Sequence, residues 1–353
     1  MNTTASSAAS SRAAGTGTLQ LEVIPYQSLA LQSSSWWESV LGVVGFEKMP
    51  TLNRTRIPVT ASMTPSLSAR DLCEVWRVTG PQIHLSSGES ARTHVRYRCS
   101  EDLLFGSLNI TEQAIEAGGE AQALIRATEL AYQEIFDVLN KTDHRHLIRI
   151  WNYLPQINAK AGGDERYRHF NAARQMAFRN SGRATMGAVP AASALGSPAG
   201  SAISIYFLAA REAPRMIENP RQTSAYHYPP KFGRHSPIFS RACVWGEPGG
   251  GTLFVSGTAS IVGHDTIHPG DVVAQTRETM VNISALLAEA NRTVGAARYS
   301  LEALKLKVYV RKPSDLAAIQ ATLSELLRPA AAIVYLQADV CREDLLVEIE
   351  AVG

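Results

Sequence analysis

The chain of 353 residues has little from which a metal site, a disulfide framework or a membrane span could be built. Its four cysteines (Cys73, Cys99, Cys243 and Cys341) show no CxxC or His/Cys ligand spacing, so neither bound zinc nor disulfides are predicted. Such cysteine usage suits a reducing compartment, and we expect a cytoplasmic protein. No apolar run reaches the roughly 18 residues that a spanning helix needs, so no membrane association is expected.

An excess of one charge is also missing. The formal net charge is +2 and 19% of residues are charged, which argues against a nucleic-acid partner bound through a basic face.

The length allows two domains. Residues 1–17 are rich in Ser, Ala, Thr and Gly and lack the apolar stretch of a secretory signal, so they are expected to form a disordered tail.

The common catalytic motifs are absent. The sequence contains no P-loop lysine motif, no GxGxxG after a predicted strand, no GxSxG and no HExxH. The glycine-rich GEPGGG at 246–251 lacks the helix start and the lysine of a phosphate site, so we expect a hairpin loop there.

Periodicity predicts a repeated strand, long helix and strand. The first copy covers a strand at 102–110, a helix at 120–140 and a strand at 146–154. The second covers a strand at 252–261, a helix at 271–291 capped by Asp271, and a strand at 304–310. A helix at about 313–327 and strands at 331–336 and 345–352 close the chain. This pattern predicts an internally duplicated α/β (α+β) fold, with two mixed sheets each packed by long helices.

The expected division has four parts. Residues 1–17 form the tail, 18–215 an N-terminal domain, 216–245 a linking strap and 246–353 a C-terminal domain. The strap region combines prolines with arginines and aromatic residues. It is either a solvated connection or a contributor to a binding site.

Arginines gather in three regions, and a guanidinium group can bind a carboxylate through two hydrogen bonds. The clusters are Arg166, Arg168 and Arg174; Arg211, Arg215, Arg221, Arg234 and Arg241; and Arg311 with Arg342. A pocket built from these segments would suit a small di-acid, whereas each arginine by itself could equally form a surface ion pair. The residues alone therefore indicate a two-domain α/β enzyme, or a binding protein for a small anion.

The last strand carries two carboxylates. Glu348 and Glu350 are two residues apart and share one side of the strand, opposite Val347 and Ile349. Cys341 lies seven residues before Glu348. If this side faces a pocket, Glu348 is a partly desolvated acid beside a thiol; if it faces water, both are ordinary surface charges, as most carboxylates are.

About the last 110 residues resemble the Rid (YjgF-type) fold. The segments that carry this resemblance are LFVSGTASIVGHDTIHPGD, ALKLKVYVRKPSD and the closing LLVEIEAVG. Rid imine hydrolases carry an arginine on the penultimate strand. The corresponding segment here, 329–337 (PAAAIVYLQ), has none, which disfavours imine hydrolysis.

The chain resembles the chorismatases over most of residues 35–353. The resemblance rests on this C-terminal half together with four segments, WNYLPQIN, ERYRHFNAARQMAF, PRQTSAYHYP and SPIFSRA. The resemblance implies two Rid-like domains and cofactor-free, metal-free cleavage of chorismate to pyruvate and a ring product. Ordinary Rid proteins are trimers with sites between subunits. A duplicated chain could supply such contacts itself, so a monomer or a trimer is expected.

The same resemblance implies the site residues. Glu348 would protonate the enolpyruvyl methylene carbon, which requires that burial raise its pKa against the effect of nearby arginines. Cys341 stands where the hydroxybenzoate-forming branch has a cysteine, although an inert buried thiol is the alternative. The implied substrate-binding residues are Arg168, Arg174, Arg221, Tyr226, Arg241 and Gly257.

The expected product is therefore 3-hydroxybenzoate, with 4-hydroxybenzoate beside it as a variant. Two alternatives remain: a hydrolytic enzyme releasing a dihydroxycyclohexadiene carboxylate, and a non-catalytic Rid-like binder of small carboxylates.

Overall fold

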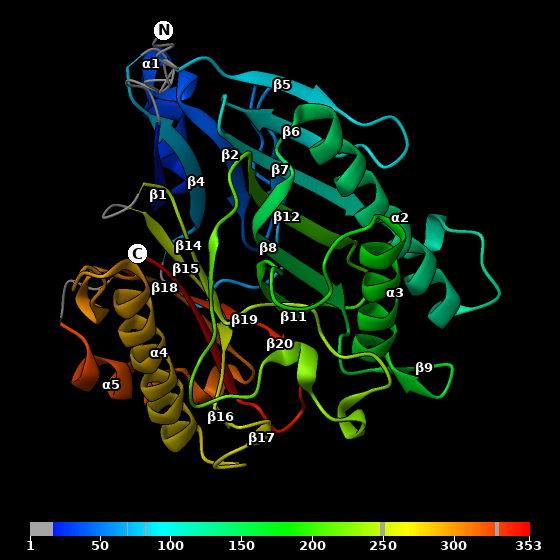
Figure 1. Cartoon of the computed structure of the whole chain (residues 1–353), viewed down its shortest axis with the longest axis vertical. Helices are drawn as coiled ribbons and strands as arrows, with labels where there is room; N and C mark the ends of the chain where they lie inside the picture. Colours follow the sequence, from blue (N-terminus) through cyan, green and yellow to red (C-terminus); the bar gives the residue numbers. More distant parts are fainter. Residues whose placement is uncertain (1–16, 69, 82, 248–250, 329–331) are drawn as a thin grey trace, which may run out of the picture.

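Three mixed sheets form the body of the molecule, and long helices cover the outer sides of two of them (Figure 1). The structure is a computed structural model that describes residues 17–353 except 69, 82, 248–250 and 329–331. Almost all of the expected tail, the centre of the glycine-rich loop and the start of the expected strand at 331–336 therefore lie outside the described residues.

The second sheet has the strand order β20-β11-β8-β12-β7-β6-β5. Its strands are β5 (Ser86–Glu89), β6 (Arg96–Cys99), β7 (Leu103–Ile110), β8 (His146–Pro155), β11 (Ala191–Ser197), β12 (Ile203–Ala210) and β20 (Asp339–Val340). Helices α2 (Glu120–Thr142) and α3 (Arg166–Asn180) belong to it. Leu124, Ala131 and Ile135 of α2 are fully buried, as the helical spacing of its apolar residues predicts.

The third sheet has the order β13-β14-β15-β21-β18-β19. Its strands are β13 (Arg215–Ile217), β14 (Ala242–Trp245), β15 (Thr252–Thr258), β18 (Lys305–Val310), β19 (Ala332–Gln337) and β21 (Val347–Val352), and its helices are α4 (Val272–Val294) and α5 (Leu316–Leu326). Asp271 caps α4 as expected, since its carboxylate accepts a hydrogen bond from the Ala274 amide at 2.9 Å. Gly295 ends α4 in the left-handed region, with φ of 71°.

These two sheets share one topology. In each, four strands that follow one another in the chain lie in the order first, fourth, second, third: β7-β12-β8-β11 and β15-β21-β18-β19. The fourth strand is antiparallel to both neighbours, and the second and third strands are parallel. A long helix joins the first strand to the second and another joins the second to the third. The expected pair of duplicated sheets with long helices is confirmed.

The first sheet repeats this arrangement a third time. It consists of β1 (Thr18–Pro25), β2 (Val40–Gly45), β3 (Val59–Ala61) and β4 (Leu72–Thr79), in the order β1-β4-β2-β3. β4 is antiparallel to β1 and β2, while β2 and β3 are parallel. Among the described residues, only the short α1 (Ser34–Glu38) and a 3₁₀ helix (Tyr26–Leu31) lie between its strands, so this part of the chain shows no long helix. The sequence-based division into two domains did not include this third copy.

The three sheets meet at a common core. Trp76 of β4, Trp151 of β8 and Phe254 of β15 come one from each sheet, and Trp76 lies 5.5 Å from Trp151 and 6.2 Å from Phe254 between ring centroids. All three are buried. The aromatic contacts fix the sheets relative to one another and so fix the geometry of any site between them.

Residues 218–241 cross from β13 to β14 as a strap with two 3₁₀ turns, Ala225–His227 and Pro230–Phe232. Two short hairpins, β9 (Lys160–Ala161) with β10 (Asp164–Glu165) and β16 (Ile261–Val262) with β17 (Asp265–Thr266), complete the fold. No helix in the described part of the chain has the length and apolar content needed to cross a bilayer.

Candidate active site

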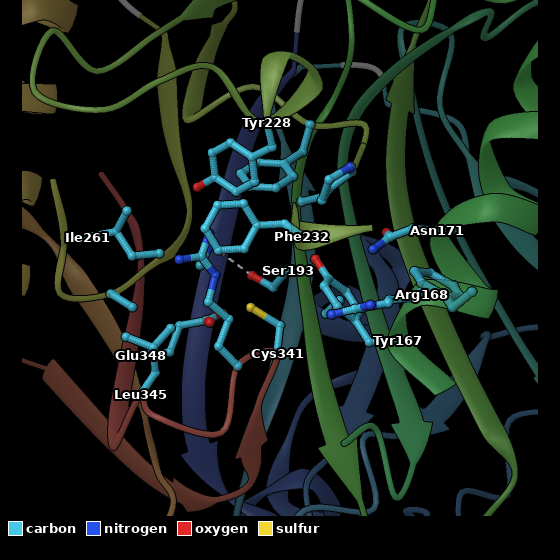
Figure 2. A pocket seen from close by; sticks show the side chains of 18 of the residues that line it. Tyr167, Arg168, Asn171, Ser193, Tyr228, Phe232, Ile261, Cys341, Leu345 and Glu348 are labelled. Atoms are coloured by element: carbon cyan, nitrogen blue, oxygen red, sulfur yellow. Dashed lines mark hydrogen bonds between the residues drawn. The ribbon is translucent and has the colours of Figure 1, made fainter. Parts of the chain in front are cut away.

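A cavity of about 460 Å³ lies between the second and third sheets. Its walls come from β11 and α3 on one side, from β15, β21 and the segment 341–345 on the other, and from the strap above. In Figure 2, Tyr228 and Phe232 of the strap lie over the cavity, with Cys341 and Glu348 below and Asn171 and Arg168 to one side. The volume suits a small organic molecule.

Glu348, the second residue of β21, points into this cavity and is only 4% exposed. The pairing of β21 with β15 is interrupted between Val255 and Thr258, next to the Glu348 side chain. Gly257 lies in this interruption, and a Cβ atom there would overlap Glu348 Oε1. The glycine therefore provides the space that the carboxyl group occupies.

Burial, and next the negative charge of Glu350, raise the pKa of Glu348 to about 8, against the opposing effect of Arg149, Arg241 and Arg311. Loss of hydration disfavours the ionised carboxylate, and this effect outweighs the attraction of the guanidinium groups. At neutral pH the carboxyl is therefore mostly protonated. This is the state that a general acid requires.

Glu350 is buried on the same side of β21 but has a different environment. Its carboxylate accepts hydrogen bonds from Arg149 (2.8 Å), Ser193 (2.7 Å) and Trp151 (2.8 Å), and forms a 2.8 Å ion pair with Lys307. Burial raises its pKa, but Lys307 and Arg149 more than compensate and hold the pKa below its usual range. The pair of carboxylates is thus divided into a protonated and an ionised member.

Cys341 is held beside Glu348 by the segment between β20 and β21. Arg311 donates hydrogen bonds to the carbonyls of Val340 (2.8 Å), Arg342 (2.8 Å) and Leu345 (2.7 Å), which fixes this segment. Burial, and next the Glu348 carboxyl, raise the pKa of the Cys341 thiol to about 12, so it stays neutral. The phenol of Tyr167 on α3 lies near this thiol and near Asn171.

Three arginines that line the cavity each have at least one guanidinium donor without a hydrogen-bond partner among the described residues. Arg174 bonds the Ile238 carbonyl (2.5 Å), Arg241 bonds Thr223 and Tyr228 (both 2.7 Å), and Arg342 bonds the His264 carbonyl (2.8 Å). Within the described residues, Nε and Nη2 of Arg174, Nε of Arg241 and Nη2 of Arg342 are buried without a hydrogen-bond partner. Buried unpaired guanidinium donors are costly unless a ligand occupies them, and carboxylates match their geometry.

The residues expected from the sequence separate into two groups. Glu348, Cys341, Arg168, Arg174, Arg241 and Gly257 all line the cavity. Arg168 is the most open of these arginines, because its side chain is 35% exposed and pairs with Asp164 at 3.2 Å.

Arg221 and Tyr226 are not part of the cavity wall that the described residues form. Arg221 forms an ion pair with Glu278 at 2.7 Å and a hydrogen bond with Asn282, which ties the strap to α4. Tyr226 packs against the core of the second sheet and the ring of His227. Both side chains therefore stabilise the strap, and the geometry gives no support for direct contact of either with a ligand.

Sequence reasoning missed several residues of the site. Arg149 is 1% exposed and lies within the apolar strand HLIRIWNYLP, where a charge signals a buried ionic role. Ser193 on β11 and Tyr228 and Phe232 of the strap also line the cavity. The ring of Phe232, which lies over the cavity in Figure 2, is 4.0 Å from the Arg342 guanidinium, a cation–π contact.

The site has no features of a metal centre. Among the described residues no group of three or more His, Cys, Asp or Glu side chains could hold a metal ion.

Comparisons with known proteins agree with this architecture. Residues 74–209 match the family described as chorismatase FkbO/Hyg5-like, N-terminal, and residues 239–353 match endoribonuclease L-PSP, which here is the Rid-like half. A crystal structure of a chorismatase superposes with a TM-score of 0.83 at 32% identity, covering 96% of this chain and 99% of that one.

Curated relatives match over most of their length. A 3-hydroxybenzoate synthase of Streptomyces hygroscopicus is 37% identical over 89% of this chain and 91% of its own. A chorismatase of Streptomyces rapamycinicus is 37% identical over 84% of this chain and 86% of its own. The Rid-like C-terminal half and the resemblance drawn from the sequence are confirmed. The chain belongs to the chorismatase family.

Proposed function

We propose that this protein cleaves chorismate to pyruvate and 3-hydroxybenzoate. The observation that carries the proposal is a buried carboxyl, Glu348, that stays protonated at neutral pH while it faces a cavity lined by several arginine side chains. A relative that is 37% identical is named 3-hydroxybenzoate synthase, which supports the choice of product.

The arginines would hold the substrate as a di-acid. Arg174 and Arg241 lie deep in the cavity and offer unpaired donors to one carboxylate, while Arg342 and the more exposed Arg168 stand closer to the opening and suit the other. Charge-assisted, bidentate contacts of this kind fix orientation as well as affinity. Once both carboxylates are held, the enolpyruvyl group can be presented to Glu348.

The chemistry needs one proton in the correct place. Glu348 donates its proton to the methylene carbon of the enolpyruvyl ether, and the positive charge that develops is shared by the ether oxygen. The neighbouring ring hydroxyl then attacks the ring carbon that carries the ether. That C–O bond breaks with its electrons on oxygen, and pyruvate leaves. The hydroxyl oxygen, which now bridges two ring carbons, gives its proton to the Glu348 carboxylate. Its original C–O bond then breaks with the electrons on oxygen, the ring carbon that keeps the oxygen loses its C–H proton to restore aromaticity, and the oxygen takes up a proton to give 3-hydroxybenzoate.

Exclusion of water decides between this route and hydrolysis. Cys341 is a neutral thiol next to Glu348, and Phe232 and Tyr228 cover the cavity from the strap. These groups leave the internal hydroxyl as the preferred nucleophile. The proposed location is the cytoplasm, supported by four cysteines that are all free thiols.

Incubation with chorismate tests the proposal, with pyruvate measured enzymatically and the ring product identified by chromatography. We expect stoichiometric pyruvate and 3-hydroxybenzoate. Glu348→Gln should lower turnover by about 10²–10⁴-fold, the usual contribution of a general acid, with an unchanged melting transition or a higher one. Glu325→Gln makes the same change at an exposed ion pair with Arg277 and should leave turnover unaltered.

Three outcomes would contradict the proposal in different ways. Chorismate binding without pyruvate release would indicate a binding protein. Pyruvate accompanied by a dihydroxycyclohexadiene carboxylate would indicate the hydrolytic reaction. Near-normal turnover by Glu348→Gln would remove Glu348 from the acid role.

A further inference from the structure

The second buried carboxylate of β21 takes no part in the proton transfer described above. We propose that Glu350 is a positioning residue whose permanently ionised carboxylate keeps the neighbouring Glu348 protonated and ready to donate. The role in catalysis rests on the proposed function, whereas the effect on protonation can be measured without any turnover.

The contacts of Glu350 keep it ionised. Two cations, Arg149 and Lys307, and two neutral donors, Trp151 and Ser193, occupy its oxygens at 2.7–2.8 Å. With four donors on its two oxygens, the Glu350 carboxylate is fully hydrogen-bonded in its ionised form. Both cations are themselves buried. A carboxylate so held is a fixed negative charge in a region of low dielectric, where charge interactions are strong.

The same contacts engage Arg149, the cation with the largest effect on Glu348. The charged groups that act on Glu348 are Glu350 on its own strand, Arg149 on β8, Arg241 at the end of the strap and Arg311 after β18. Arg149 donates to Glu350 and to Ser193 (2.5 Å). Arg241 bonds Thr223 and Tyr228, and Arg311 bonds Asp339 and three carbonyls. Each guanidinium is therefore directed to another partner.

Glu350 thus acts on Glu348 in two ways. It repels a second negative charge two residues away on the same face of the strand, and it neutralises Arg149, which would otherwise attract one. Ser193 connects the two positions, because its hydroxyl donates to Glu350 and accepts a hydrogen bond from the Gly257 amide at 3.0 Å. Gly257 is the residue that makes room for the Glu348 carboxyl.

The charged cluster continues into the first sheet. Lys307 on β18 pairs with Glu350 and, at 2.6 Å, with Glu74 on β4, and it donates to the phenol of Tyr206 on β12 at 2.9 Å. All three sheets therefore contribute a side chain to the cluster. Glu74 is not among the charged groups that act most on Glu348, which makes it a control with the same chemistry and similar burial.

The expected pH dependence follows from the acid role. Only protonated Glu348 can donate, so turnover should fall as pH rises through its pKa of about 8. Removing the charge of Glu350 lowers the pKa of Glu348, so the fall should occur at a lower pH. In Glu350→Gln we expect the midpoint to move down by about one pH unit or more, because a neighbouring like charge in a buried site raises the pKa of a carboxyl by about that amount.

Two measurements test this expectation. The first follows the protonated-carboxyl infrared band against pH without substrate, using the difference between each protein and the same protein carrying Glu348→Gln. The second is the pH profile of kcat for pyruvate release. The Glu350→Gln midpoint should fall in both, while kcat well below the midpoint stays within about tenfold of wild type. Glu74→Gln should leave the midpoint in place.

The outcomes separate this inference from the proposed function. An unchanged infrared midpoint in Glu350→Gln overturns the inference whatever the activity. A moved midpoint in a protein that releases no pyruvate supports the effect on protonation and contradicts the proposed function. A loss of kcat that is equal at every pH would show a merely structural role for Glu350. If Glu350→Gln does not fold, Lys307→Met/Glu350→Gln, which removes one charge of each sign, should show the same downward shift.

Discussion

At the scale of single residues, the site depends on two neutral groups, a carboxyl that would ordinarily be ionised and a thiol that is held neutral even at high pH. Glu348 is an acid held protonated near neutral pH, and Cys341 is a thiol whose pKa of about 12 keeps it from acting as a thiolate. If either group were ionised, its negative charge would raise the pKa of the other. The combination of neutral carboxyl and neutral thiol is therefore the stable one. Cys341 is accordingly suited to filling space and excluding water beside the acid.

This interpretation predicts a specific defect in Cys341→Ala. Removing the sulfur leaves room next to Glu348 for a water molecule, which can compete with the ring hydroxyl. We expect pyruvate release within about tenfold of wild type, with a dihydroxycyclohexadiene carboxylate appearing beside 3-hydroxybenzoate. Chromatography of the ring products measures the ratio.

Cys243→Ala provides the matched control, since Cys243 is a fully buried thiol on β14 that does not line the cavity. It should lower stability without changing the products. An unaltered product ratio in Cys341→Ala would leave the cysteine with only a structural role.

At the scale of elements, the segment between β20 and β21 brings Cys341 and Arg342 into the cavity, and its shape depends on one side chain. Arg311 bonds two of its carbonyls, those of Arg342 and Leu345, and the carbonyl of Val340 at the end of β20, and it forms a 2.8 Å ion pair with Asp339. It also bonds Asn158 of the second sheet's domain at 3.1 Å. This arginine organises the segment and has little capacity left for substrate.

Arg311→Met should therefore disturb both the stability and the selectivity of the enzyme. Loss of charge-assisted hydrogen bonds to partly buried carbonyls is expected to lower the free energy of unfolding by about 2–4 kcal/mol. KM should rise and the product ratio broaden, because Cys341 and Arg342 are no longer held. Denaturant unfolding and steady-state kinetics measure these effects. Arg311→Lys keeps the charge but loses the planar set of guanidinium donors, so its stability and KM should lie between those of wild type and Arg311→Met. Wild-type KM and products in Arg311→Met would contradict the assignment.

The elements were largely predictable from the sequence because their signals are local. The long helices α2 and α4 and the alternating strands β8 and β18 follow from periodicity over windows of 7 to 21 residues. The third copy was missed because β1–β4 have no long helix between them, and β3 has only three residues. Short strands give little periodicity, so pairing with the rest of the molecule defines them.

The site was only partly predictable, since it depends on contacts between distant segments. Glu348 and Cys341 stand close together in sequence, and the side of β21 that faces the cavity is set by packing against the second sheet. Arg149 and Ser193 reach Glu350 across 201 and 157 residues of chain. Arg221 looks like a ligand-binding arginine in the sequence, and only the position of α4 shows that Glu278 engages it.

At the scale of the whole molecule, three sheets of one topology surround a shared core. The strand orders β1-β4-β2-β3, β7-β12-β8-β11 and β15-β21-β18-β19 are the same arrangement repeated within one chain. The Rid resemblance implies trimers with sites between subunits, and here a single chain supplies three such units.

The protein should consequently be an active monomer. Its central contacts, such as Trp76 with Trp151 and Lys307 with Glu74, already join the three sheets internally, so no second copy is needed to complete the core or the cavity. Light scattering should give a mass near 38.2 kDa. Specific activity should stay constant on dilution from about 10 µM to about 10 nM, since an assembly with a dissociation constant in that range would come apart. A mass of three chains, or activity lost on dilution and regained on concentration, would show that the site needs a neighbouring subunit.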